Sequence, residues 1–271
     1  MLCRWSPSIT MQLSLWLHGG SVVGVVLWPA TWPWLLAAII ANHFLLGVLG
    51  MWPRSSLLGP NISRLPTSCK YAGYVALTFD DGPDPGVTPA VLEVLDRYAA
   101  KATFFCVAQR AARHPDLVKE IVRRGHSVQN HTVRHPAAFA FYGPLTLYRE
   151  ITDAQRTLSE IAGGEPRFFR APFGLRNPFL DPVLAWTNLG YVSWTRRGFD
   201  RVSRCPDKVL KRLTRQLSGG DILVLHDCGS HMRGVDRPIV LQVLPPLLDH
   251  IVRCGLRPVS LPIAFKSQSL I

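Results

Sequence analysis

The sequence predicts an α/β fold: a closed or nearly closed (β/α)7 barrel of the TIM type, preceded by an N-terminal transmembrane helical hairpin. From Tyr74 onward, short apolar runs alternate with amphipathic stretches, and this alternation is typical of a parallel sheet with helices outside. Before that point, no Asp, Glu, Lys or Arg occurs between Arg4 and Arg54, which indicates a segment suited to an apolar environment. We therefore expect two structurally different parts in one chain.

Composition limits the other possibilities. The chain has 271 residues, of which 48% are hydrophobic and 18% are charged. This length suffices for one domain of ordinary size and an additional segment. Disorder is excluded because it requires low hydrophobicity and high charge, and the uncharged segment excludes a chain that is globular and soluble throughout. We expect a membrane hairpin over residues 1–53, a linker rich in Pro, Ser and Arg over 54–73, and one globular domain over 74–265.

The N-terminal segment contains two apolar runs, at about residues 12–28 and 34–52. Each approaches the roughly 20 residues with which a helix spans a bilayer, and Pro29 and Pro33 between them break a continuous helix. The flanks are basic and the connecting loop is uncharged, so the positive-inside rule places both ends and the large domain in the cytoplasm, at a bacterial inner membrane. The alternatives are a signal peptide followed by a surface segment, and a re-entrant hairpin. The sequence shows no clean small-residue cleavage site, which favours the transmembrane hairpin.

The formal net charge of +12 predicts an anionic partner, which could be nucleic acid, anionic lipid or an anionic substrate. The basic residues are mostly scattered Arg, and neither zinc-finger spacing nor an RNA-recognition signature occurs, so we expect no nucleic acid partner. Membrane lipid is the expected partner, because anionic head groups attract basic segments. Six widely spaced cysteines form no C-x-x-C pair and are expected to be free thiols: Cys3, Cys69, Cys106, Cys205, Cys228 and Cys254.

Seven strands are expected after the linker, each a short apolar run. They lie at Val75–Phe79, Ala102–Val107, Ser127–Asn130, Arg167–Arg170, Tyr191–Thr195, Ile222–Leu225 and Arg257–Leu261. Amphipathic helices are expected between them, and most end near a glycine that suits a C-terminal cap. They lie at Thr88–Ala100, Pro115–Arg124, Leu145–Ile161, Phe179–Leu189, Asp207–Leu217 and Ile239–Arg253. In the first helix, Thr88 is the expected N-cap and Pro89 the first helical residue.

Polar and ionisable residues gather where these strands end, and in such a barrel the carboxyl ends of the strands meet on one face. They are Asp80, Asp81, Asn130, His131, His135, Arg170, Asp200 and His226. The sequence therefore predicts a site at this end of the sheet.

His131 and His135 are the expected metal ligands, because residues four apart on one helical turn face the same way and can share a metal. A carboxylate from another strand end would complete a set of two histidines and one carboxylate that leaves positions for water and substrate. Asp80 and Asp81 both qualify, and their repulsion is relieved if one binds metal while the other acts as a base. A plain turn with a helix cap is the alternative for this pair.

Three further residues carry weaker signals. Arg170 is able to orient or ion-pair a carboxylate, although a surface ion pair is the simpler interpretation. The turn at Phe173 can present a backbone N–H to a developing oxyanion. His226 ends a very apolar strand and suits a general acid, because the unperturbed pKa of histidine lies near neutrality.

In combination, these residues resemble the motifs of the polysaccharide deacetylases of the NodB-homology type, carbohydrate esterase family 4, over about residues 74–262. Four motifs occur in the family's order: Thr78–Pro83, His131–His135 with Asn130 before it, Arg170–Gly174, and Asp221–Asp227. The family's remaining motif often has acidic residues followed by Trp. This chain departs from it, because it reads Trp194–Arg201 there and has Arg201 in place of the Trp.

The resemblance implies that the (β/α)7 TIM-like barrel is distorted. It also implies a divalent metal, commonly Zn²⁺, with Co²⁺, Ni²⁺ or Mn²⁺ also accepted. It implies Asp81, His131 and His135 as metal ligands, Asp80 as general base, His226 as general acid, Arg170 as the residue that tunes Asp80, and Asp200 as the residue that orients Arg170 or His226. For the substrate, it implies the Phe173 backbone at the oxyanion, Leu225 at the acyl methyl group, and Asn130 beside the ligand pair.

The expected function is removal of an N-acetyl or N-formyl group from an amino sugar by a membrane-tethered, metal-dependent hydrolase. A cytoplasmic domain beside the bilayer suits a sugar linked to polyprenyl phosphate, whereas the reverse topology suits an envelope polysaccharide or peptidoglycan. Two alternatives remain open. One is a catalytically inactive, membrane-anchored glycan-binding protein, and the other is an O-acetyl esterase on the same fold.

Overall fold

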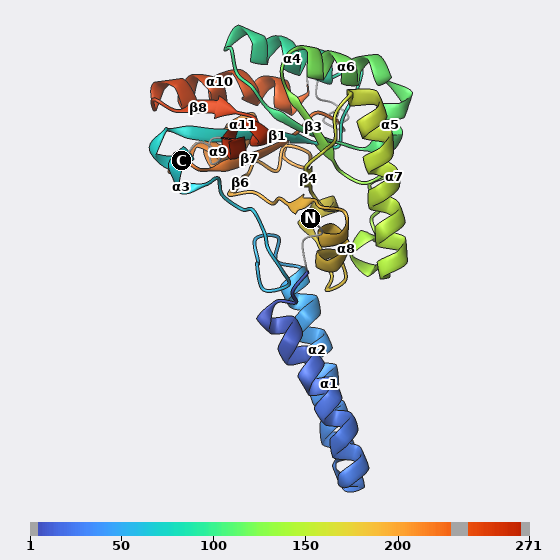
Figure 1. Cartoon of the computed structure of the whole chain (residues 1–271). Coiled ribbons are helices and arrows are strands. Elements are labelled where there is room, and N and C mark those ends of the chain that lie inside the picture. Colours follow the sequence, from blue (N-terminus) through green and yellow to red (C-terminus); the bar gives the residue numbers. More distant parts are fainter. Residues whose placement is uncertain (1–4, 229–237, 267–271) are drawn as a thin grey trace.

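The computed structural model describes residues 5–228 and 238–266, so Cys3 and Arg4 lie outside the described part. It confirms the predicted fold class. Figure 1 shows a curled parallel sheet with helices outside it, and two N-terminal helices that project from this domain as a pair. The five cysteines of the described part are all free, as expected.

The two N-terminal helices, α1 (Ile9–Leu27) and α2 (Trp32–Gly50), lie side by side (Figure 1). Both are long and apolar enough to cross a membrane. They meet through polar contacts: the Asn42 amide donates to the Ser14 hydroxyl over 2.8 Å, and the rings of His18 and His43 lie 5.1 Å apart. Such contacts between apolar helices are typical of helix pairs in membranes.

The sheet contains β1 (Tyr74–Asp80), β2 (Thr103–Cys106), β3 (Ser127–Asn130), β4 (Phe168–Phe169), β5 (Gly190–Tyr191), β6 (Arg196–Arg197), β7 (Ile222–His226) and β8 (Arg257–Val259). In the described residues the order is β5-β4-β3-β2-β1-β7-β6, with β8 beside the start of β1, and every pair is parallel. The end strands β5 and β6 do not pair with each other, so the sheet is a half-barrel. Strand β6 was not predicted, because two arginines show no apolar run.

All six expected helices occur, with ends shifted by a few residues. They are α4 (Thr88–Arg97), α6 (Pro115–Arg123), α7 (Pro144–Ala162), α8 (Leu180–Trp186), α9 (Pro206–Thr214) and α10 (Ile239–Arg253). Three short helices, α3 (Thr67–Tyr71), α5 (Ala108–Arg113) and α11 (Leu261–Lys266), were not predicted. Each is too short to show a clear helical period.

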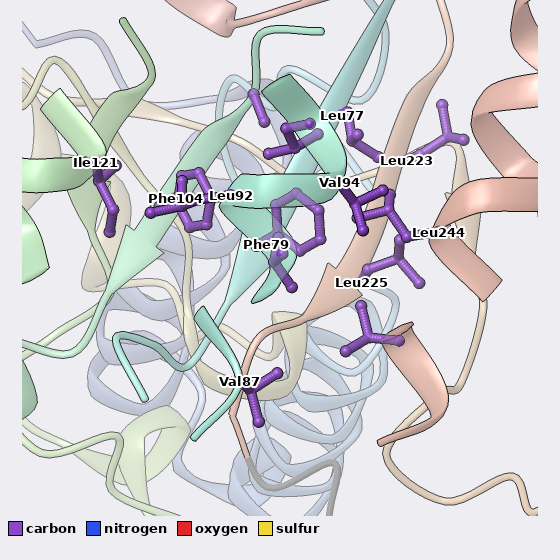
Figure 2. Close-up of a cluster of buried hydrophobic side chains, with 14 of the residues drawn as sticks. Leu77, Phe79, Val87, Leu92, Val94, Phe104, Ile121, Leu223, Leu225 and Leu244 are labelled. Carbon is purple, nitrogen blue, oxygen red and sulfur yellow. The ribbon is translucent and has the colours of Figure 1, made fainter. Parts of the chain in front are cut away.

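The main core lies between the sheet and the outer helices. Figure 2 shows Phe79 of β1 and Leu225 of β7 beside Leu244 of α10. Because successive side chains of a strand point to opposite faces, their neighbours Asp80 and His226 face the other side, into the curl of the sheet. This alternation separates the core from the site.

The segment expected as a linker packs against the domain. Leu58, Leu65 and Cys69 are buried. Ile62 forms a parallel bridge with Val192, and the Leu65 N–H donates to the Gly220 carbonyl over 2.8 Å. The segment therefore lies along the open side of the half-barrel and ties the N-terminal helices to the domain.

Candidate active site

A cavity of about 340 Å³ lies at the carboxyl ends of the strands. It is lined by Asp80, Asp81, His131, His135, Phe173, Gly174, Trp194, Arg197, Arg201, Val202, Val224 and His226. Most of the polar residues predicted from the strand ends are among them. The sequence prediction that the strand ends form one site is consistent with this arrangement.

The backbone around the cavity is strained. Asp81, His135 and Phe173 line the cavity with φ angles of 75°, 55° and 59°, in the left-handed region that residues other than glycine rarely adopt. Thr132, between the two histidines, has a φ of 69°. Such strain is stored where the surrounding structure holds side chains in required positions.

Three side chains offer ligand atoms to one metal ion. The Asp81 Oδ1 atom lies 3.2 Å from the Nε2 atoms of both His131 and His135, and the three ligand atoms lie within 4.8 Å of one another. Asp81 Oδ1 is buried and accepts no hydrogen bond. An orphaned buried carboxylate oxygen is costly, and a cation between these atoms would satisfy it. The residues therefore fit a divalent metal.

The protonation of these ligands suits a metal. Burial raises the pKa of Asp81, but the contact with His131 and the charges of His131, His226 and His135 outweigh it, so the pKa lies below its usual range. Burial and the neighbouring His131 lower the pKa of His135 to about 4. At neutral pH the site holds a carboxylate and a neutral imidazole, the forms that bind metal. The His131 Nδ1 atom lies 2.7 Å from the Arg170 carbonyl, which leaves Nε2 for the metal.

The two histidines do not lie on a helical turn, and this part of the prediction was wrong. They lie in the loop after β3, which is folded by side chains. The Thr132 hydroxyl accepts from the His135 N–H over 2.9 Å. The buried Glu150 of α7 accepts hydrogen bonds from the backbone N–H groups of Val133 and Arg134 over 3.1 and 3.0 Å.

Asn130 does not face the cavity, contrary to its expected place in the substrate site. Its amide donates to the Ile151 carbonyl and to Gln155, and its oxygen accepts from the Thr132 N–H over 3.0 Å. It is fully buried. Asn130 therefore fixes the start of the histidine loop.

Asp80 is held by a buried arginine. Arg170 is wholly inaccessible to solvent, and it donates to Asp80 Oδ1 over 2.6 Å and to the Thr78 hydroxyl over 2.8 Å. Its other donors reach the carbonyls of Val192 and Ser193 over 3.3 and 3.0 Å. The surface ion pair considered from the sequence is thus excluded, and Arg170 orients Asp80.

His226 is held by Asp200. The Asp200 carboxylate lies 2.8 Å from His226 Nδ1 and accepts from the His226 backbone N–H over 2.8 Å. Burial lowers the pKa of His226, but the charge and hydrogen bond of Asp200 outweigh it, so the pKa is raised. Of the two partners expected for Asp200, the structure brings it to His226.

The Leu225 side chain does not line the cavity. It lies in the core (Figure 2), whereas Val224 lines the cavity with His226. The period of two along a strand places the residue two before His226 on the same face, and this signal was available in the sequence. Phe173 is at the cavity as expected, with its ring 5.0 Å from that of His135.

Comparison with known proteins identifies the family. The sequence profile of polysaccharide deacetylases matches residues 67–192. The chain is 32% identical over 185 residues to a peptidoglycan-N-acetylglucosamine deacetylase of Bacillus cereus, covering 68% of this chain and 84% of that protein. The chain belongs to the polysaccharide deacetylase family.

Two further relatives agree. A chitooligosaccharide deacetylase of Bradyrhizobium is 34% identical over 154 residues, covering 56% of this chain and 70% of that protein. The crystal structure of a peptidoglycan N-acetylglucosamine deacetylase with a bound N-hydroxybenzamide superposes with a TM-score of 0.69 and 28% identity, over 76% of this chain and 92% of that one. As a member of this family, the protein is a carbohydrate deacetylase, a hydrolase of N-acetyl amides.

The deacetylase also contains a buried carboxylate that the sequence did not single out. The Asp227 Oδ2 atom accepts from the Thr88 hydroxyl over 2.7 Å, so Thr88 is not the N-cap of α4 that we predicted; Val87 occupies that position. A Cβ atom at residue 82 would overlap the Asp227 carboxylate, which explains Gly82 in the first motif. Burial raises the pKa of Asp227 to about 7.

The sequence analysis also did not assign a role to three arginines around the deacetylase cavity. Arg110 donates to the Asp81 carbonyl over 2.7 Å. Arg201 lines the cavity and forms an ion pair with Asp81. Arg197 lines the cavity as well. The departure from the family's motif around Arg201 was the one signal in the sequence.

Proposed function

We propose that this protein is a metal-dependent carbohydrate N-deacetylase that removes an acetyl or formyl group from an amino sugar, with residues 74–265 as its catalytic domain. The observation that carries the proposal is the position of Asp81 Oδ1, buried, without a hydrogen bond, and 3.2 Å from two histidine Nε2 atoms. The Asp80–Arg170 and His226–Asp200 pairs are at the same cavity.

The metal would be held by Asp81, His131 and His135. When bound, it polarises the acyl carbonyl and lowers the pKa of water. Two imidazoles and one carboxylate suit Zn²⁺, and Co²⁺, Ni²⁺ and Mn²⁺ accept the same donors.

The remaining residues move protons and stabilise charge. Asp80, paired with Arg170 and aligned by it, accepts the proton of the attacking water. The backbone N–H of Phe173 donates to the developing oxyanion. His226, whose pKa is raised in favour of the protonated form, transfers its proton to the departing amine. The products are acetate or formate and a free amino sugar.

The same residues bear on the two alternative functions, a glycan-binding protein and an O-acetyl esterase. An inactive glycan-binding protein does not require a carboxylate–arginine pair and a histidine–carboxylate pair at one cavity, so the intact pairs favour an enzyme. An O-acetyl esterase would use the same groups on an ester. Competition between an amide and an ester substrate of the same sugar separates these two activities.

The position of the cavity supports a substrate at the bilayer surface. Helix α2 ends at Gly50, and a Cβ atom on Gly174, which lines the cavity, would lie 2.9 Å from Pro53. The Arg54 guanidinium lies 3.5 Å from the Thr195 carbonyl. The cavity rim thus contacts the chain just after the apolar helix. We propose an acylated amino sugar on polyprenyl phosphate as the substrate, at the cytoplasmic face of a bacterial inner membrane.

The test is acyl release from a membrane glycolipid extract, together with metal content by elemental analysis. We expect wild type to contain about one divalent metal ion and to release acetate or formate, and His131→Ala and a chelated sample to lose both. His250→Ala, on α10, is the matched control. Metal-independent release would contradict the proposal. Release from peptidoglycan or chitooligosaccharide but not from glycolipid would retain the deacetylase and reject the lipid-linked substrate.

A further inference from the structure

Three arginines of one short segment have different environments. Arg196 does not line the cavity. It already has partners, because it pairs with Asp221 over 2.6 Å and donates to the carbonyls of Arg215 and Gln216. Arg201 lines the cavity and is paired with Asp81. Arg197 differs from both.

Arg197 is half-buried and lines the cavity. Its guanidinium lies 5.0 Å from the ring centre of Trp194 and 4.9 Å from that of Phe199. No residue of the described chain forms a hydrogen bond or ion pair with it. Burial lowers its pKa, although the charges of Asp80, Asp200 and Asp81 oppose this. A guanidinium has five N–H donors and no acceptor, and the described residues use none of these donors of Arg197.

The surroundings of Arg197 hold it in position. Two aromatic rings contact the guanidinium and restrict its motion without using its N–H groups. The fork of donors therefore remains available to a ligand in the cavity. A guanidinium binds the oxygens of a phosphate or carboxylate in a bidentate manner, and such bonds are the stronger ones in a site shielded from water.

We propose that Arg197 binds an anionic substituent, a phosphate or a carboxylate, of the sugar whose acyl group is removed. The inference rests on the proposed deacetylase function and names the class of its substrate: an acidic rather than a neutral amino sugar. Arg197 is thus a specificity-determining residue, placed in the same cavity as Asp80 and His226.

The test compares three acetylated substrates on the full-length, metal-loaded chain. They are neutral chitotetraose, N-acetylglucosamine 1-phosphate, and a disaccharide that carries the carboxylate of N-acetylmuramic acid. We expect wild type to prefer at least one acidic substrate in kcat/KM. Arg197→Gln should lower this preference about 10- to 100-fold, and Arg197→Lys should lower it less. Preference for the phosphate or for the carboxylate identifies which anion is bound.

Binding gives a readout that does not depend on turnover. In the Asp80→Asn background, the Kd for the preferred acidic sugar should rise by the same factor when Arg197→Gln is added. Arg212→Gln is the control, because Arg212 contacts the same Phe199 ring at 5.5 Å and lies outside the cavity lining. It should leave the preference and the Kd unchanged.

The outcomes distinguish a failure of the proposed deacetylase function from a failure of the inference about Arg197. No acyl release from any substrate would reject the proposed function itself. Release with equal efficiency from acidic and neutral substrates, or an acidic preference that Arg197→Gln leaves intact, would reject the inference and retain the function. If Arg197→Gln does not fold, Arg197→Lys and the salt dependence of the wild-type preference decide, because added salt must weaken an ionic contact.

Discussion

Two buried arginines in the chain after β4 show how the cavity differs from the junction with the N-terminal helices. Arg170 binds a carboxylate and a hydroxyl, Asp80 and Thr78, besides two carbonyls. Within the described residues, Arg176 donates to backbone carbonyls alone, those of Ser55 over 2.6 Å, Gly59 over 3.1 Å and Pro60 over 3.4 Å. Both side chains are at least nine-tenths buried.

The difference is one of function. At the cavity, Arg170 pairs with the Asp80 carboxyl group and orients it. At the junction, the guanidinium of Arg176 donates hydrogen bonds to several carbonyls of the segment between α2 and α3 and so holds this segment in place. Burial without an ion pair lowers the pKa of Arg176. Changes on the cavity side should therefore reduce catalysis, and changes on the junction side should reduce stability.

The largest effect is expected from Asp80→Asn. The amide cannot accept a proton from water, so kcat should fall about 10³-fold. The bound metal should remain, because Asp80 is not among the three ligands. Elemental analysis and acyl release measure both quantities, with Asp153→Asn on the exposed face of α7 as the control. An active Asp80→Asn variant would show that another group is the base.

Arg170→Lys should have the next largest effect. Lysine keeps the charge but loses the planar fork, so Asp80 loses its alignment and the carbonyls of Val192 and Ser193 lose their donors. We expect kcat/KM to fall about 10²-fold and the free energy of unfolding to fall by about 1–3 kcal/mol. Kinetics and thermal unfolding test this. A loss of stability with unchanged kcat/KM would place Arg170 in the same class as Arg176.

Asp200→Asn should shift the pH dependence. The Asp200 charge raises the pKa of His226, and a general acid works only below its pKa, so activity is lost as pH rises through that value. Removal of the charge lowers the pKa and moves the alkaline limb of the kcat profile to lower pH. At pH 8 we expect about a 10²-fold loss, and near pH 6 a smaller one. Asp207→Asn is the control, and an unmoved alkaline limb would remove Asp200 from this role.

The residues changed in these variants were all candidates from the sequence. The sequence predicted that they meet at one cavity, but it did not predict the local structure around each of them. Strand ends predicted the cavity because parallel strands must deliver their carboxyl ends to one face. The same rule could not say that the loop from His131 to His135 is irregular, since its shape depends on Glu150 of α7, which is distant in sequence. The spacing of four therefore pointed to two histidines that the structure brings together, but the predicted helical turn was wrong.

Other errors have the same origin in non-local packing. Thr88 has the identity of a helix cap, but its hydroxyl serves Asp227, 139 residues away. Asn130 borders the ligands in sequence, yet its side chain turns to α7. Leu225 is different, because its orientation followed from the alternation of β7 and could have been predicted. Arg197 carries no local signal apart from the departure of its motif.

The smallest effect on catalysis is expected from Arg176→Lys, which tests the junction side of the comparison. Lysine cannot reach the carbonyls of Ser55 and Gly59 together, so the free energy of unfolding should fall by about 1–3 kcal/mol, or a few degrees in Tm. On a soluble sugar, kcat/KM should change less than about threefold, because none of the carbonyls that Arg176 binds belongs to a residue that lines the cavity. Arg156→Lys, an exposed arginine of α7, is the control.

The same variant decides whether the junction positions the cavity at the bilayer. Arg176 ties the segment after α2 to the loop that contains Gly174, so its loss should loosen the cavity from the helices without altering the chemistry. Turnover of a lipid-linked sugar in vesicles should then fall more than turnover of the soluble sugar. A fall on the soluble sugar as large as that of Arg170→Lys would show that cavity and junction form one catalytic unit, and would contradict the distinction drawn between the two arginines.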